Sequence, residues 1–163
     1  MGTNRHGIFL TTACICVLIS ETGCDDGASP IDPKAFDKNL EEHRAACVEK
    51  INAFRSTLAL PPYERWTDGE SCADDAAKAD ASKDEPHGAF QSCEEVAQNE
   101  CPGWGSVDKV FEGCFQMMWD EGPGEDYTKH GHYTAMAHEL YTQVACGFHV
   151  TDGGEVWAVQ NFR

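Results

Sequence analysis

The clearest pattern of apolar and polar positions in the chain lies between residues 106 and 118. Apolar side chains recur there at intervals of three and four, which is the spacing of one face of an α-helix. They are Val107, Val110, Phe111, Cys114, Phe115 and Met118. Ser106 is a good N-cap residue, and Gly122-Pro123-Gly124 provides a stop. The pattern therefore predicts an amphipathic helix that begins after Ser106.

Two earlier segments also have helical character. Cys47, Ile51, Phe54 and Leu58 share one helical face, which predicts a helix from about residue 33 to 57, ended by the prolines at 61–62. The alanine-rich segment from 67 to about 82 predicts a second helix. For that helix we expect Thr67 as the N-cap, with Glu70 three residues later completing a capping box.

The last part of the chain alternates with a period of two. Apolar side chains at every second position from 144 to 150, the turn Asp152-Gly153-Gly154 and a returning segment at 156–162 predict a β-hairpin. We expect another short strand at 93–98, a turn at 102–105 and a polar loop before Gly131-His132-Tyr133. The pattern as a whole predicts one α+β domain in which helices cover a small, mainly antiparallel sheet.

The first residues predict an export signal. About 14 mostly apolar residues, 7–20, follow the basic Arg5, which is too short a run to span a bilayer. We interpret residues 1–23 as a signal peptide and 24–38 as a polar tether. The sequence Thr22-Gly23-Cys24 resembles a bacterial lipoprotein cleavage site, with Cys24 as the lipid acceptor, and an ordinary secretory signal is the alternative. No other stretch is apolar enough to predict a transmembrane helix.

Charge and cysteine content narrow the class of protein. The chain has 163 residues and a formal net charge of −16, which disfavours nucleic acid and anionic lipid headgroups as partners. Of nine cysteines, six remain beyond Cys24, an even set typical of three disulfides in an exported protein. They are Cys47, Cys72, Cys93, Cys101, Cys114 and Cys146. Six cysteines allow 15 pairings. One candidate is a Cys93–Cys101 bridge, which would close a single loop. The competing interpretation of these cysteines is a catalytic thiol.

Candidate chemistry rests on histidines and glutamates in loops. His138-Glu139 begins like a zinc-protease motif, but Thr142 stands where the second histidine is needed. The remaining candidates can hold a cation or move protons, although scattered residues of these types are usually surface residues. They are His87, Glu94, Glu95, Glu121, Glu125, His130 and His132.

Several motifs, in order, resemble the CAP superfamily, which includes cysteine-rich secretory, antigen-5 and pathogenesis-related class 1 proteins. The resemblance covers residues 39–163. It is carried by 51–55 (INAFR), 60–63 (LPPY) with Trp66, 131–136 (GHYTAM), 144–147 (VACG) and the closing segment 157–162. It implies a three-layer α-β-α sandwich for this domain.

The resemblance also implies a cleft that binds a divalent cation, Zn²⁺ or another, through His87, Glu94, Glu121 and His132. Glu121 follows Trp119 one position earlier than is usual in the family, so Glu125 is the alternative. Ala135 also departs from the family pattern, which places a glutamine there.

Two functions follow as expectations. The first is an exported, monomeric binding module, secreted or lipid-anchored at the cell envelope, for a lipid, a sterol or an extracellular protein or glycan. The second is a metal- or Glu/His-dependent hydrolase of an extracellular or envelope substrate, with Glu94 and His132 as the candidate catalytic residues.

Overall fold

The computed structural model describes residues 31–163. The predicted signal peptide at 1–23, the lipid acceptor Cys24 and the first part of the tether lie outside the described residues. The tether prediction extended to residue 38, but residues 33–38 belong to the first helix.

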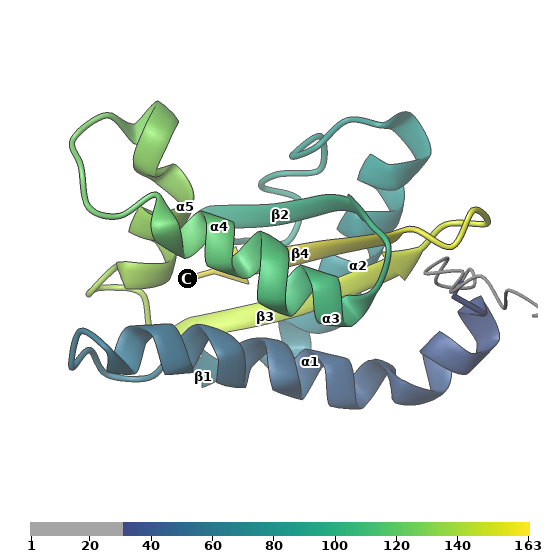
Figure 1. Cartoon of the computed structure of the whole chain (residues 1–163), viewed down its shortest axis with the longest axis horizontal. Helices are drawn as coiled ribbons and strands as arrows, with labels where there is room; N and C mark the ends of the chain where they lie inside the picture. The colour runs from purple at the N-terminus through teal and green to yellow at the C-terminus, as the bar shows by residue number, and fades with distance from the viewer. Residues whose placement is uncertain (1–30) are drawn as a thin grey trace, which may run out of the picture.

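Helices lie on both faces of a four-stranded sheet, so the predicted three-layer α-β-α sandwich is confirmed (Figure 1). The strand order is β1-β3-β4-β2; β1 pairs with β3 in parallel and the other two pairings are antiparallel. The elements are α1 (Pro33–Ser56), β1 (Glu64–Arg65), α2 (Thr67–Lys83), β2 (Ala97–Trp104), α3 (Val107–Lys109), the π-helical turn η1 (Val110–Cys114), α4 (Phe115–Asp120), α5 (Tyr127–Ala137), β3 (Gln143–Val150) and β4 (Val156–Phe162).

The core is divided by the sheet. A large apolar cluster joins α1 and the helices that follow β2 to one face, and a smaller one joins α2 to the other. Helix α2 lies so close to β3 that a Cβ added at Gly147 would come within 2.1 Å of the Ala73 carbonyl carbon. Small residues in α2 permit this approach, which the alanine-rich sequence predicts.

The predicted helices are largely confirmed, with two corrections. Helix α2 has Trp66 as its N-cap with no side-chain capping bond, so the predicted Thr67 cap and capping box are wrong. Glu70 is buried and is bound instead by Arg65, with Nε–Oε1 at 2.5 Å and Nη2–Oε2 at 2.9 Å. A buried carboxylate needs a charged partner more than it needs to cap a backbone N–H.

The helix predicted after Ser106 begins there, with Ser106 Oγ accepting a hydrogen bond from the Lys109 amide. It is interrupted by the π-helical turn η1, which inserts an extra residue and turns the face of α4 relative to α3. Gly113 lies in this turn, and a Cβ there would come 2.6 Å from the Trp104 ring. The π turn therefore lets the helix lie against the end of β2.

Two segments differ from prediction. The strand expected at 93–98 is β2, at Ala97–Trp104, with an irregular register between Cys101 and Trp104 where a turn was expected. The polar loop expected before Gly131 is largely helix α5, which is capped by the Asp126 side chain. Consecutive residues of β2 are buried, so the strand lacks the alternation that predicts one-sided strands.

Three disulfides form, as expected from the six cysteines. Cys47–Cys146 joins α1 to β3, Cys72–Cys93 joins α2 to the segment before β2, and Cys101–Cys114 joins β2 to η1. A Cys93–Cys101 bridge is therefore excluded. Since each bridge links two different elements, each limits how far one layer can move from the next.

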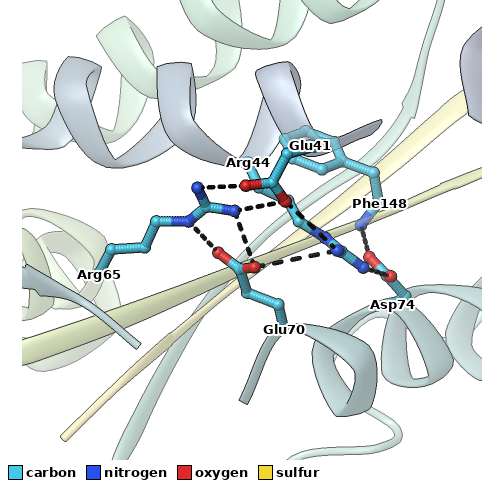
Figure 2. Close-up of polar contacts among 6 residues, drawn as sticks. All are labelled: Glu41, Arg44, Arg65, Glu70, Asp74 and Phe148. Atoms are coloured by element: carbon cyan, nitrogen blue, oxygen red, sulfur yellow. Dashed lines mark hydrogen bonds and ion pairs between the residues drawn. The ribbon is translucent and has the colours of Figure 1, made fainter. Parts of the chain in front are cut away.

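A charged network joins α1, β1 and α2 beside the sheet (Figure 2). Arg65 is bidentate to Glu41, at 2.8 and 2.9 Å, as well as to Glu70. Arg44 pairs with Asp74 and approaches Glu70 to 3.9 Å. Because Glu70 is buried between two guanidinium groups, its charge is compensated within the fold.

Asp74 also binds the sheet. Its Oδ1 accepts a hydrogen bond of 2.8 Å from the Phe148 amide on β3, as Figure 2 shows. The paired part of β1 ends at Arg65, opposite Val144. Farther along β3, the Asp74 carboxylate thus provides an acceptor where a longer neighbouring strand would provide a carbonyl group.

Candidate cation-binding cleft

The cleft lies beside β2, an edge strand of the sheet, and His132 on α5 is central to it. Its Nδ1 is 2.5 Å from Glu121 Oε1. The other oxygen of Glu121 accepts the backbone amides of His132 at 3.0 Å and Tyr133 at 3.2 Å. Since a carboxylate is an acceptor, it holds the proton on Nδ1 and leaves the Nε2 lone pair of His132 free.

The second imidazole, of His87, comes from the segment between α2 and β2. The residue has a left-handed φ of 62°, and its backbone amide donates to Glu100 Oε2 at 2.5 Å. Its Nδ1 is 2.9 Å from Gln98 Oε1, while the Gln98 amide group donates to Asn161 Oδ1 at 3.0 Å. With the Gln98 amide in this orientation, the Nδ1–H tautomer of His87 donates to Gln98 Oε1.

The two rings face each other across the cleft. Their centroids are 6.3 Å apart, with an interplanar angle of 26°. Both side chains are partly exposed, at 41% for His87 and 38% for His132. In the tautomers whose Nδ1–H groups donate to these oxygen atoms, the two imidazoles offer two Nε2 lone pairs to a cation, the usual arrangement around metal-ligating histidines.

A pair of buried acidic residues lies next to His87. Asp80 on α2 and Glu100 on β2 are buried, and burial raises the pKa of both carboxyl groups. The neighbouring Asp80 charge adds to this effect, and the pKa of Glu100 rises to about 7. The pair therefore favours sharing a proton over carrying two charges.

Three of the four predicted ligands meet at this cleft: His87, Glu121 and His132. Glu121 reaches His132 although it comes one residue early, and Glu125 is not the partner. Before helix α5, the loop is held by His130, whose Nδ1 is 2.7 Å from the Glu121 carbonyl oxygen and whose ring packs against Gly124. The close packing at Gly124 is what allows this loop to position Glu121.

Glu94 does not join the group. It precedes β2 with a left-handed φ of 65° and lines a different pocket, beside the Cys72–Cys93 bridge and Arg163. The residues that contact His87 are Gln98 and Glu100, which the sequence analysis did not select. They lie two positions apart on one face of β2, and a correctly placed strand would have indicated both.

No set of three or more His, Cys, Asp or Glu side chains within 31–163 is arranged to hold a metal ion. A cation at the cleft would therefore be bound by the two imidazoles, with Glu121 and Gln98 as the groups that orient them. Two nitrogen ligands suit zinc, copper or nickel better than calcium or magnesium.

Two cavities meet at His132. The smaller, of about 290 Å³, is lined by His87, Gln98 and residues of α5 with Phe90 and Tyr127 at its rim. The larger, of about 760 Å³, extends along β2 and α4 past Glu121. A species bound at His132 can thus be reached from either cavity.

Comparisons with known proteins identify the family and the fold. A family model described as the cysteine-rich secretory protein family, CAP, matches residues 48–162. None of the curated proteins is significantly similar in sequence.

Solved structures share the fold at low identity. A structure of NaASP2 with Zn²⁺ has a TM-score of 0.58 and 16% identity, covering 75% of this chain and 79% of that one. BmVAL-1 has a TM-score of 0.57 and 18% identity, covering 74% and 76%. An outer surface protein from Borrelia burgdorferi has a TM-score of 0.53 and 16% identity, covering 82% and 95%.

The chain belongs to the CAP family. Membership and the three disulfides indicate an exported protein that serves as an extracellular interaction module. In the part of the chain that the structure describes, no helix is both long and apolar enough to cross a membrane.

Proposed function

We propose that the protein is an exported CAP-domain interaction module whose cleft binds a divalent cation, Zn²⁺ in the first instance, through His87 and His132. The observation that carries the proposal is the paired Nδ1 contact, 2.9 Å to Gln98 and 2.5 Å to Glu121. It leaves two Nε2 lone pairs available on partly exposed rings. A relative of the same fold has been solved with Zn²⁺.

The ring separation sets the character of this site. A divalent cation would be held here by the two imidazoles, whose centroids are 6.3 Å apart, where the two cavities meet at His132. Such an ion supplies an electrophilic anchor for an oxygen or nitrogen atom of a partner, which is how it would contribute to recognition.

The partner belongs to the extracellular or envelope environment in this proposal. A protein, a glycan, a lipid or a sterol reaching the two cavities would complete the coordination. Retention at the envelope would follow from lipidation of Cys24, which mass spectrometry of the mature N-terminus tests directly.

The test is zinc titration of the purified protein by isothermal calorimetry. We expect saturable binding in the wild type, and at least about tenfold weaker binding in His87→Ala and in His132→Ala. His149→Ala is the matched control, because His149 lies on β3 outside the cleft. Equal zinc affinity in the wild type and in the His87→Ala/His132→Ala double variant would exclude the site.

A further inference from the structure

The larger cavity is a groove with two unlike ends. It follows β2 beside η1 and α4, which lie next to one another in Figure 1. Asn99 on β2 donates to the His132 carbonyl oxygen at 3.1 Å, so the imidazole marks one end of the groove. Trp104 and Gly105, five and six residues farther along, mark the other. The lining residues are Glu100, Pro102, Gly103, Trp104, Gly105, Cys114, Met117, Met118, Glu121 and His132.

The wall of the groove is apolar and adaptable. Met117 is 65% exposed and lines the groove beside Met118. Met118 and Trp104 continue the surface, and methionine side chains repack readily around different ligands. The π-helical turn directly before α4 sets the direction in which these methionines lie, and such turns are frequent at functional sites.

The His132 end of the groove is an acceptor. His132 offers its Nε2 lone pair, and Glu121 carries a negative charge with room for one more donor beyond the three that it already binds. Among the described residues, no Lys or Arg side chain lines the groove. Lys109 lies beside Gly105 at the far end of the groove, where a Cβ on Gly105 would be 3.7 Å from its Nζ.

The groove has an apolar wall that leads to a carboxylate and an imidazole acceptor. A ligand that complements it has an apolar chain ending in a cationic group. We infer that this groove binds a lysine side chain on an exposed segment of a partner protein. The four-carbon stem would lie against Met117 and Met118, and the ammonium group would donate to Glu121 and to Nε2 of His132. The neighbouring residues of the partner segment would extend toward Trp104.

The charge of the whole chain supports a basic protein as the partner. The net charge of −16 attracts a basic surface over distances of about a Debye length and disfavours anionic lipids and nucleic acids. A cavity of about 760 Å³ is larger than one lysine side chain needs, so the neighbouring residues of the partner segment also fit. The inference names a partner class for the same interaction module in its metal-free state, since an ammonium group and a zinc ion would compete for Nε2 of His132.

The test uses the purified protein with isotope-labelled methionine methyl groups. Three acetylated, amidated tripeptides are titrated: Leu-Lys-Leu, Leu-norleucine-Leu and Leu-Glu-Leu. We expect the lysine peptide to shift the methyl signals of Met117 and Met118 and to leave Met136, which is 1% exposed in the core, unchanged. The norleucine peptide has the same stem without the charge, and we expect it to bind about tenfold more weakly. We expect no binding of the glutamate peptide.

Variants and a lipid-like amine complete the design. Glu121→Gln should weaken binding of the lysine peptide by about tenfold, and Lys109→Met should leave it unchanged or strengthen it. Equal affinity for the lysine and norleucine peptides, or shifts confined to signals outside the groove, would overturn the inference. Saturation by decylamine with no shift from the lysine peptide would also overturn it, in favour of a free amphiphilic amine.

The result is separable from the zinc proposal. His87 lines the smaller cavity and not the groove. We therefore expect His87→Ala to lose zinc binding and to keep binding of the lysine peptide. In the wild type, the methionine shifts should be complete after zinc is removed by a chelator and reduced at saturating zinc, because both ligands use Nε2 of His132. Loss of peptide binding with normal zinc binding in the wild type would contradict only the lysine inference.

Discussion

The two sides of the sheet are held in different ways. On the α2 side, helix and strand are in backbone contact at Gly147, and a charged network joins α2 to α1 and β1. On the opposite face, beyond β2, the chain forms a π-helical turn, loops and two cavities. The comparison indicates that the α2 side makes the fold rigid. The edge at β2 can therefore carry exposed, adaptable side chains and polar groups that still have free hydrogen-bonding capacity for a ligand.

The largest effect on the free energy of unfolding should come from the close contact between α2 and β3. Gly147→Ala places a Cβ within about 2.1 Å of the Ala73 backbone, so α2 must separate from β3, and we expect a loss of about 3 kcal/mol or more in the free energy of unfolding. Urea unfolding followed by circular dichroism measures this. The control is Gly153→Ala, where the nearest atom would be 3.6 Å away and the change should stay within about 0.5 kcal/mol. Similar losses in both variants would contradict the close-packing account.

The next largest effect on the free energy of unfolding should come from the charged network around Glu70. Arg65→Met leaves the buried Glu70 without its bidentate partner, and we expect a loss of about 2 to 3 kcal/mol. The double variant Arg65→Met/Glu70→Gln should recover part of this loss, because the uncompensated charge is gone. If the double variant is no more stable than the single one, the network contributes packing and not charge compensation.

A pH-dependent effect should follow from Glu100. Its pKa rises from 4.5 to about 7 on folding, so the folded state binds more protons than the unfolded state between these values. The free energy of unfolding should therefore fall as the pH increases from about 4.5 to 7 and then level off. Glu100→Gln removes this titration, so its stability curve should be flatter over the same range. Parallel curves for the wild type and Glu100→Gln would show that Glu100 does not retain its proton.

The smallest effect on stability should come from the groove. Met117 is 65% exposed, so Met117→Ala should change the free energy of unfolding by less than about 0.5 kcal/mol. The same substitution should weaken binding of the lysine peptide by several-fold. Met118→Ala, which removes a buried side chain, should cost about 2 kcal/mol or more. A large loss of stability in Met117→Ala would place this side chain in the core.

The sequence predicted the elements whose signals are local. The periodic apolar face after Ser106 and the alternation from Val144 to Val150 each correspond to an observed helix and strand. The π-helical turn was beyond prediction because the apolar spacing is compatible with a continuous α-helix, and the turn depends on the approach of Gly113 to Trp104.

The sequence predicted the members of the site that lie outside β2, namely His87, Glu121 and His132, and missed Gln98 and Glu100 on β2. Strand β2 opens with Ala97-Gln98-Asn99-Glu100-Cys101, all buried, and its polar members are satisfied largely by distant residues such as Asn161 and His132. Such burial produces no periodic pattern. The strand was therefore placed too early. Glu94 was chosen from the family resemblance, which did not indicate the groups that contact His87. Helix α5 was missed for a related reason, because its threonine and glycine residues have low helix propensity.

The hydrogen bond from Phe148 to Asp74 has a consequence for how copies of the protein behave toward one another. An edge strand with unpaired amides is a template on which a second chain can add a strand and begin to aggregate. Asp74 occupies one such amide, and Arg44 keeps the carboxylate in place. A charged side chain at this position also repels an incoming strand. At Phe148 the edge of β3 therefore offers no free amide to an incoming strand, although β1 does not extend that far.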